Sequence, residues 1–274
     1  MSENKEVQPS GGEEREFTAS SSSAIYDAPL SWVALFGALL AVGSLVPVIV
    51  YPGGGGYSSL SNTVLFVLTG FVLGPWAGLV AGLIGGLIGL FIAPAAFPLG
   101  FVDVFLVGGF QCMLGGLIAM KWKKYMFIWW IFNLATIFFF PYRWPGASQG
   151  FETPTEPAYL GSYWWVGLGL VIWLLFAYTP FGDWVKQGKK AYMQVLGFVG
   201  ASYAAITSFY GLYGNTYYYL LKYPIERSII ENHATGPLFM VTGVAQGIVA
   251  LLVFRALWRT GLRKVPGSLL EETA

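Results

Sequence analysis

The chain alternates long apolar segments with short polar connections. Transmembrane strands alternate in segments of about ten residues, whereas these runs are continuously apolar, which favours helices. A helix of about 20 residues crosses a hydrocarbon core of ~30 Å, so most of these segments are long enough to span a membrane. The pattern predicts an all-α polytopic transmembrane bundle with eight spans, at residues 30–51, 57–73, 76–97, 101–120, 125–140, 163–179, 191–213 and 237–257.

Two of these segments and both ends of the chain need separate treatment. The second and fifth segments are short for a full crossing, so each is either a tilted span or a partly re-entrant one. Residues 1–29 are rich in Glu and Ser, and such a composition predicts a disordered acidic tail rather than a signal peptide, which starts with a short basic region. Residues 259–274 turn basic and then acidic. The transmembrane domain is therefore expected at 30–258.

Cationic residues flank the predicted spans unevenly. If the N-terminus is cytoplasmic, twelve of the fifteen Lys and Arg fall on the inner side, and only Arg143, Lys222 and Arg227 remain outside. Cationic residues next to spans collect on the cytoplasmic side of membranes. The distribution therefore predicts that both termini are cytoplasmic and that the chain is a multi-pass protein of the cell (cytoplasmic) membrane.

Composition narrows the possible chemistry. Only 11% of the 274 residues are charged and 55% are hydrophobic, with a mean hydropathy of +0.61, whereas soluble domains have about 25% charged residues. The net charge of +1 gives no broad attraction for nucleic acid. Cys112 and His233 are the single cysteine and histidine, and no P-loop, HExxH or dinucleotide motif is present. We expect no catalysis, no metal, no cofactor and no nucleic-acid partner.

Glycines recur every four residues in the segment GFVLGPWAGLVAGLIGGLIG. Residues four apart share a helix face, and such small-residue faces let transmembrane helices approach closely. The pair Gly74-Pro75 predicts a tight hairpin between two helices. The residues expected in helix packing are Gly74, Gly78, Gly82 and Gly86. Taken by itself, this pattern favours ordinary close packing in a helical bundle.

The order of these features resembles a family. An apolar first helix with an AxxxA pair precedes the Gly-rich loop PGGGGYSSLSN, a second helix, Gly74-Pro75 and a Gly/Ala-rich third helix. This order is similar to that of the substrate-binding (S) component of energy-coupling-factor transporters, which import vitamins and other micronutrients. The resemblance covers about residues 30–120 and, more loosely, 225–260. The aromatic-rich middle of the chain, about 125–190, has no counterpart in it.

The resemblance implies partners and a site. Members of that family bind a small molecule near the outer surface and dock on a transmembrane coupling subunit driven by two cytoplasmic ATPases. By analogy, Ala34 and Ala38 would form the partner interface, and the loop from Gly53 to Asn62 would cap the bound substrate. The lipid bilayer is the remaining expected partner.

Polar and aromatic residues near the outer ends of the spans are the candidates for substrate binding. Asp103 is the only acid within a predicted span, and it either receives a ligand amine or hydroxyl or serves as a helix N-terminal acid favoured by the macrodipole. A Tyr-rich stretch at 210–223 is suited both to interface anchoring and to stacking on a heterocyclic ligand. The candidate substrate-binding set is Asn62, Asp103, Tyr210, Tyr213, Asn215, Glu231 and His233.

Other polar and aromatic residues have structural interpretations. The amides Gln111, Asn133, Gln194 and Gln246 are expected to join neighbouring helices by hydrogen bonds. Aromatic residues at the outer span ends, among them Tyr51, Tyr163 and Trp165, are expected to anchor at the interface.

Two functions remain open at this point. One is a substrate-capture subunit that binds a small nutrient for uptake. The other is a non-catalytic structural or accessory transmembrane subunit of a larger membrane complex.

Overall fold

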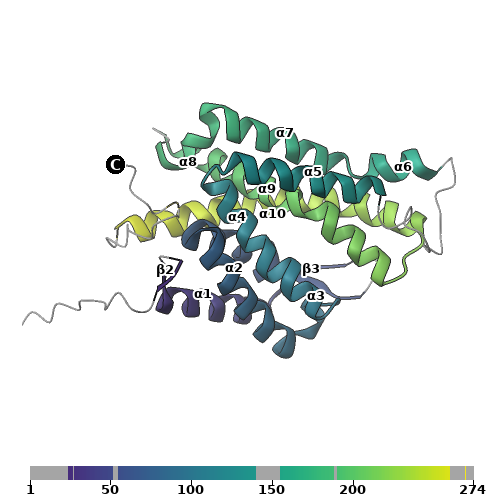
Figure 1. Ribbon diagram of the computed structural model, residues 1–274, viewed down its shortest axis with the longest axis horizontal. Coiled ribbons are helices and arrows are strands. Elements are labelled where there is room, and N and C mark those ends of the chain that lie inside the picture. Colours follow the sequence, from purple (N-terminus) through teal and green to yellow (C-terminus); the bar gives the residue numbers. More distant parts are fainter. Residues whose placement is uncertain are drawn as a thin grey trace, which may run out of the picture.

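The structure is a computed structural model that describes residues 24–26, 28–51, 55–139, 155–187, 190–259 and 269. Within this part of the chain helices predominate, and strands form only two small antiparallel pairs. One pair joins β1 (Ala24–Ile25) to β2 (Ala28–Pro29), and the other joins β3 (Pro47–Val50) to β4 (Tyr57–Ser59). In Figure 1, α1 and α2 lie at the bottom of the bundle and α5 and α7 at the top, with α9 and α10 between them.

The long apolar helical segment formed by η1 (Ser61–Leu65) and α2 (Phe66–Ile92) folds back on itself at Gly74. Gly74 has φ +77° and ψ 178°, a conformation that is accessible because glycine has no Cβ. A Cβ built on Gly78 would lie 3.1 Å from the Cα of Gly70, whereas residues eight apart in a straight helix are separated by ~12 Å. The hairpin predicted at Gly74-Pro75 is therefore confirmed, with two arms in contact.

A second apolar helix packs along both arms of this hairpin. It runs through α3 (Phe101–Asp103), π-helical η3 (Val104–Phe110) and α4 (Gln111–Ala119), after the short turn η2 (Pro94–Ala96). A Cβ built on Gly82 would overlap the carbonyl oxygen of Gly108, and one on Gly86 would lie 3.4 Å from the Cα of Gly108. Glycines therefore bring these backbones into direct contact, as predicted for Gly78, Gly82 and Gly86. Helix α1 (Leu30–Gly43) packs on the second arm, where a Cβ on Gly85 would lie 2.5 Å from the Leu40 Cβ.

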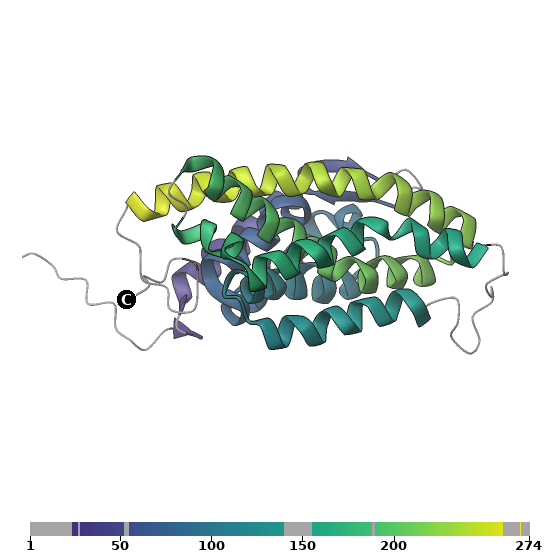
Figure 2. The ribbon, with the colours of Figure 1, turned by 90° about the horizontal axis from the view of Figure 1, so that it is seen from above.

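The other half of the bundle packs with large rings. Its long helices are α5 (Lys123–Phe139), α7 (Trp164–Tyr178), α9 (Ala191–Leu220) and α10 (Ile225–Arg259), with the shorter α6 (Thr155–Ser162), η4 (Pro180–Asp183) and α8 (Trp184–Gln187) connecting them. Trp130, Trp165 and Trp173 are among its largest fully buried side chains. Helix α9 is central and contacts α4, α5, α7 and α10. Figure 2 shows the long helices of this half running along the length of the molecule.

Amide side chains join the helices, as predicted. The Gln111 Nε2 donates to the Asn62 carbonyl at 3.2 Å, and Gln246 on α10 donates to the Thr63 carbonyl. Asn133 of α5 accepts from the Leu212 N–H at 3.0 Å and donates to the Thr207 carbonyl on α9. Gln194 accepts from Arg255 at 3.2 Å, which links α9 to α10. Each of these four amide side chains therefore joins two different helices.

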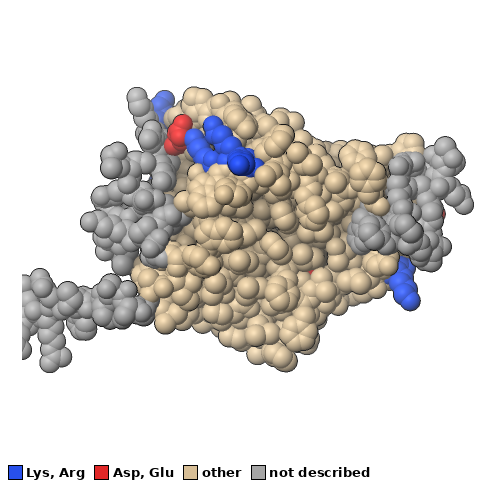
Figure 3. All heavy atoms as spheres, viewed as in Figure 1, with Lys and Arg blue, Asp and Glu red and all other residues tan. Residues whose placement is uncertain are grey.

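Within the described residues, four helices are long and apolar enough to cross a membrane: Ser61–Ile92, Phe101–Ala119, Ala191–Leu220 and Ile225–Leu257. Leu30–Gly43 and Trp164–Tyr178 are shorter apolar helices. Many large apolar side chains on the outside of the bundle are exposed, for example Phe91, Ile131 and Val241. Figure 3 shows a broad surface free of Lys, Arg, Asp and Glu between charged side chains at its two ends. These features are those of a multi-pass helical membrane protein.

The predicted span boundaries need correction at both ends of the chain. The first segment is not one helix over 30–51, because α1 ends at Gly43 and residues 47–50 form β3. Pro47 and the β-branched residues after it favour a strand over a helix. The last helix begins at Ile225, twelve residues before the predicted start at 237. The tails predicted at 1–29 and 259–274 lie mostly outside the described residues.

Candidate functional site

Four separate parts of the chain meet at one end of the bundle. They are the β3–β4 hairpin, the start of η1 near Asn62, the start of α3 near Asp103, and the junction of α9 with α10. The opposite end carries Lys121, which pairs with Asp183, and Arg255. Lys121 and Arg255 belong to the cationic residues assigned to the inner side, so the convergence occurs at the end predicted to face outward.

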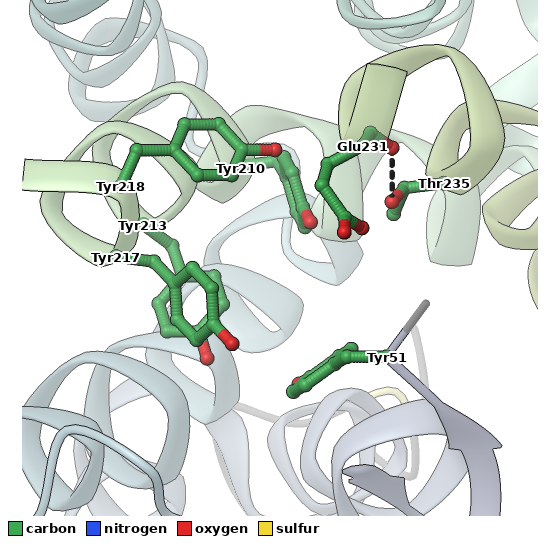
Figure 4. Close-up of a pocket in the computed structure, with 7 residues that line it drawn as sticks. All are labelled: Tyr51, Tyr210, Tyr213, Tyr217, Tyr218, Glu231 and Thr235. Atoms are coloured by element: carbon green, nitrogen blue, oxygen red, sulfur yellow. Dashed lines mark hydrogen bonds between the residues drawn. The ribbon is translucent and has the colours of Figure 1, made fainter. Parts of the chain in front are cut away.

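A pocket opens at this convergence. It encloses about 290 Å³, including the space at its mouth, and is lined by Tyr51, Tyr210, Tyr213, Tyr217, Tyr218, Glu231 and Thr235. Figure 4 shows the Glu231 carboxylate pointing into the space that the tyrosines surround, with Tyr51 on the far side from α10. Binding sites for small molecules are typically concave, mostly apolar and supplied with a few polar groups. This pocket has that character, with an aromatic wall and a single carboxylate.

The spacing of the tyrosines places them on one face of α9. Tyr210, Tyr213 and Tyr217 are three and four residues apart, so they project in nearly the same direction from the helix. Their rings touch in sequence, with centroids 5.9 Å apart for Tyr210–Tyr213 and 6.1 Å apart for Tyr213–Tyr217. Tyr51 meets Tyr217 edge to face at 5.7 Å from the other side of the opening. The pocket wall is therefore a continuous aromatic surface.

The ring of Tyr218 is fixed by a chain of hydrogen bonds. Its hydroxyl donates to the Asn232 Oδ1 at 2.7 Å, and the Asn232 Nδ2 donates to the Ser162 Oγ at 3.0 Å. All three residues are buried. This chain ties α9, α10 and α6 together behind the pocket, which holds the wall rigid.

The β3–β4 hairpin carries Tyr51 to the pocket. Tyr57 anchors the hairpin by donating from its hydroxyl to the Ser44 carbonyl at 3.0 Å. At its tip, a Cβ built on Gly55 would lie 2.8 Å from the Tyr217 hydroxyl, so this glycine permits close approach to α9. Burial raises the pKa of the Tyr51 phenol above its ordinary value, so this group stays neutral at physiological pH. Part of the loop predicted to cap the substrate, residues 52–54, lies outside the described residues.

Asp103 lies directly behind the tyrosines. It is fully buried, and its Oδ2 accepts from the Leu99 N–H at 2.7 Å, while its Oδ1 has no hydrogen-bond partner. The carboxylate is near enough to Tyr51 and Tyr213 to act on both electrostatically. Asn62 adjoins Tyr51 in the same region. Both Asn62 and Asp103 lie in or beside a π-helical segment, a feature that is frequent at functional sites.

The predicted substrate-binding residues thus divide into three groups. Tyr210, Tyr213 and Glu231 line the pocket, and Asp103 and Asn62 interact with its tyrosines without lining it. Asn215 is not part of the lining: it accepts from the hydroxyls of Tyr159 and Tyr163 and donates to the carbonyls of Thr136 and Gly211. His233 is exposed and does not line the pocket either.

Four of the seven lining residues are absent from the candidate set: Tyr51, Tyr217, Tyr218 and Thr235. Tyr217 and Tyr218 do lie in the Tyr-rich stretch that the sequence singles out. Tyr51 and Trp165 were expected to anchor at the interface, but Tyr51 lines the pocket and Trp165 is fully buried between Tyr210 and Phe239. Thr235 carried no signal in a stretch expected to be a loop. The helix that begins at Ile225 places Thr235 one turn after Glu231, whose carbonyl accepts from the Thr235 hydroxyl at 2.6 Å.

No protein-family model, curated protein or solved structure matches the chain.

Proposed function

We propose that this protein is a membrane-embedded substrate-capture subunit that binds a small solute from the outer side, in the manner of the S components it resembles. The observation that carries this proposal is the tyrosine pocket, which opens at the end of the bundle remote from the basic residues. We also propose that the chain crosses the membrane eight times, with the basic end in the cytoplasm. The hairpin at Gly74 supports this count because it provides two crossings from one long helical segment.

The chemistry of the pocket favours binding over catalysis. Its lining offers phenols, a carboxylate and a hydroxyl. Phenol and carboxylate groups fixed around an aromatic wall can hold a ligand by ring contacts and hydrogen bonds. The lining residues include no Cys or His that would form a nucleophile–base pair with the Thr235 hydroxyl.

The surface of α1 is compatible with a partner. Ala34 and Ala38 are both exposed and lie one helical turn apart. Small exposed side chains let another helix approach the backbone closely. We propose this face as the contact for a transmembrane coupling subunit driven by cytoplasmic ATPases.

Purification from native membrane in mild detergent, followed by native mass spectrometry, tests this function. We expect a bound small molecule together with co-purifying ATPase and coupling subunits. The protein recovered without any small molecule, in a stable complex of another kind, would instead identify it as an accessory subunit.

A second comparison tests the partner face. Ala34→Trp with Ala38→Trp should abolish association with the coupling subunit and leave ligand binding unchanged. Ile131→Trp is the matched control, because Ile131 is 55% exposed on α5, away from the proposed face. Equal loss of association in both variants would contradict the assignment of α1.

Amine labelling tests the topology. Lys124 in the first turn of α5 and Lys222 just after α9 are both exposed. The start of α5 and the end of α9 lie at opposite ends of the bundle (Figure 1). A membrane-impermeant amine reagent applied to intact cells should modify Lys222 and spare Lys124, with both modified after permeabilisation. Modification of Lys124 in intact cells would rule out the proposed orientation.

A further inference from the structure

We infer that the tyrosine pocket takes an organic cation, a small molecule carrying an ammonium group. This inference rests on the proposed function, because it names the class of solute that the same pocket captures. Three features carry it: the aromatic wall, the presence of two carboxylates near that wall, and a contact between the Arg227 side chain and the neighbouring Tyr223 ring.

The first feature is the wall. Five of the seven lining residues are tyrosines, and the faces of their rings carry negative electrostatic potential that attracts cations within about 6 Å of the centroid. Rings on two sides of the opening, Tyr51 on the hairpin and Tyr217 on α9, approach edge to face. Walls of this kind, with several aromatic rings around one space, recognise ammonium groups.

The second feature is the placement of negative charge. Glu231 points into the pocket and acts electrostatically on Tyr217 and Tyr218. Asp103, which is not itself a lining residue, acts electrostatically on Tyr51 and Tyr213. Both carboxylates therefore act on tyrosines of the wall. The lining residues themselves include no Lys, Arg or His.

Asp103 in particular points to a positively charged ligand. Its side chain is 0% exposed, yet its Oδ1 has no hydrogen-bond partner. A buried carboxylate oxygen without a hydrogen-bond partner is costly, and that cost falls when a cation comes near. A neutral aromatic ligand would fill the wall without compensating this oxygen, and an anion would raise the cost further.

The third feature is a cation already held at the edge of the cluster. The Arg227 guanidinium lies 4.1 Å from the centroid of the Tyr223 ring, and Tyr223 stacks on Tyr218 at 5.7 Å. Arg227 is exposed, so this contact forms at the rim and leaves the interior of the pocket to a ligand. Tyr223, which adjoins the lining residue Tyr218, therefore already holds a cation of this chain.

Isothermal titration calorimetry on the full chain in lipid nanodiscs tests the inference with two probes of the same shape. Choline carries the ammonium charge, and 3,3-dimethylbutan-1-ol is its neutral isostere. We expect choline to bind at least about tenfold more tightly, a ratio equivalent to ~1.4 kcal/mol. Equal affinity for the two probes would overturn the inference.

Variants locate the interaction. Tyr210→Leu should weaken choline binding about tenfold, whereas Tyr210→Phe, which keeps the ring, should retain it within about twofold. Glu231→Gln and Asp103→Asn should each reduce the preference for choline over the isostere. If Asp103→Asn does not fold, Glu231→Gln and the two Tyr210 variants still test whether the carboxylate and the rings of the pocket bind choline. A preference unchanged in Glu231→Gln would overturn the role of negative charge.

Failure of this inference is distinguishable from failure of the proposed function. If neither probe binds and native mass spectrometry finds a neutral or anionic small molecule, the cation inference is wrong and substrate capture stands. If neither probe binds and no small molecule is found, both are wrong.

Discussion

The two halves of the bundle achieve close packing by opposite means. In the half formed by α1, α2 and α4, glycines remove side chains, and backbone meets backbone, as between Gly82 and Gly108. In the half formed by α5, α7, α9 and α10, large rings and amides fill the space, as with Trp165 packed between Tyr210 and Phe239. The pocket lies where the β3–β4 hairpin of the first half meets the rings of the second.

The difference explains where a cavity can form. Flat glycine faces fit together with no space between them, because nothing projects from either surface. Rings are rigid and large, so a cluster of them leaves gaps at its edge unless other groups fill those gaps. The glycine half therefore acts as the rigid support, and the aromatic half supplies the site.

The largest expected effect concerns the glycine half. Gly82→Ala should lower the free energy of unfolding by about 3 kcal/mol, because the added Cβ would overlap the Gly108 carbonyl oxygen and the backbones must separate. Thermal unfolding in detergent, followed by circular dichroism, measures it. Gly167→Ala is the matched control: nothing lies within 4 Å of its added Cβ, so stability should be unchanged or rise by up to ~1 kcal/mol. Similar losses in both variants would contradict backbone contact as the cause.

A smaller effect is expected from the amide network of the aromatic half. Asn215→Ala should cost about 2 kcal/mol, because it removes the acceptor for two tyrosine hydroxyls and a donor to two carbonyls on α5 and α9. The neighbouring Thr216→Ala removes only a bond to the Leu212 carbonyl one turn back, and should cost about 0.5 kcal/mol or less. The comparison uses the same unfolding assay. A loss in Thr216→Ala as large as in Asn215→Ala would show that the network adds nothing.

The smallest effect is expected at the basic end, where packing is not involved. Lys121 pairs with Asp183, and both side chains are substantially exposed, at 27% and 54%. Asp183→Asn should therefore cost no more than about 1 kcal/mol, and the difference should shrink in 1 M salt. A loss that persists at high salt would indicate that Asp183 has a role beyond this ion pair.

Periodicity and small-residue spacing predicted much of the fold. The structure contains the Gly74-Pro75 hairpin, the glycine contacts and the four interhelical amides. Each was predictable from local chemistry: the turn preference of Gly-Pro, the close approach that small residues permit, and the need of an amide in a span for a hydrogen-bond partner. The end of the first helix was missed because Val46–Val50 is as apolar as a span, and hydropathy does not distinguish an exposed strand from a helix. The early start of α10 was missed because its first turns are polar.

The site was only partly predictable, because the sequence shows which residue types are present and not which of them the fold brings together. Tyr210 and Tyr213 were found because tyrosines cluster in the sequence, and Asp103 because an acid in a span is unusual. Tyr51 reaches the pocket only through the β3–β4 hairpin, whose pairing brings together residues far from α9 in sequence. Asn215 was misassigned because sequence does not show which face of α9 points to α5 and α6 and which points to the pocket.

The burial of Cys112 against the glycine hairpin has a practical consequence. Cys112 is 0% exposed, and its sulfur lies against Gly82 in the second arm of the hairpin. A maleimide or spin label will therefore ignore the natural sulfhydryl and react only where a cysteine has been introduced. The wild-type chain is thus ready for site-directed spectroscopy, with no need for a cysteine-free background.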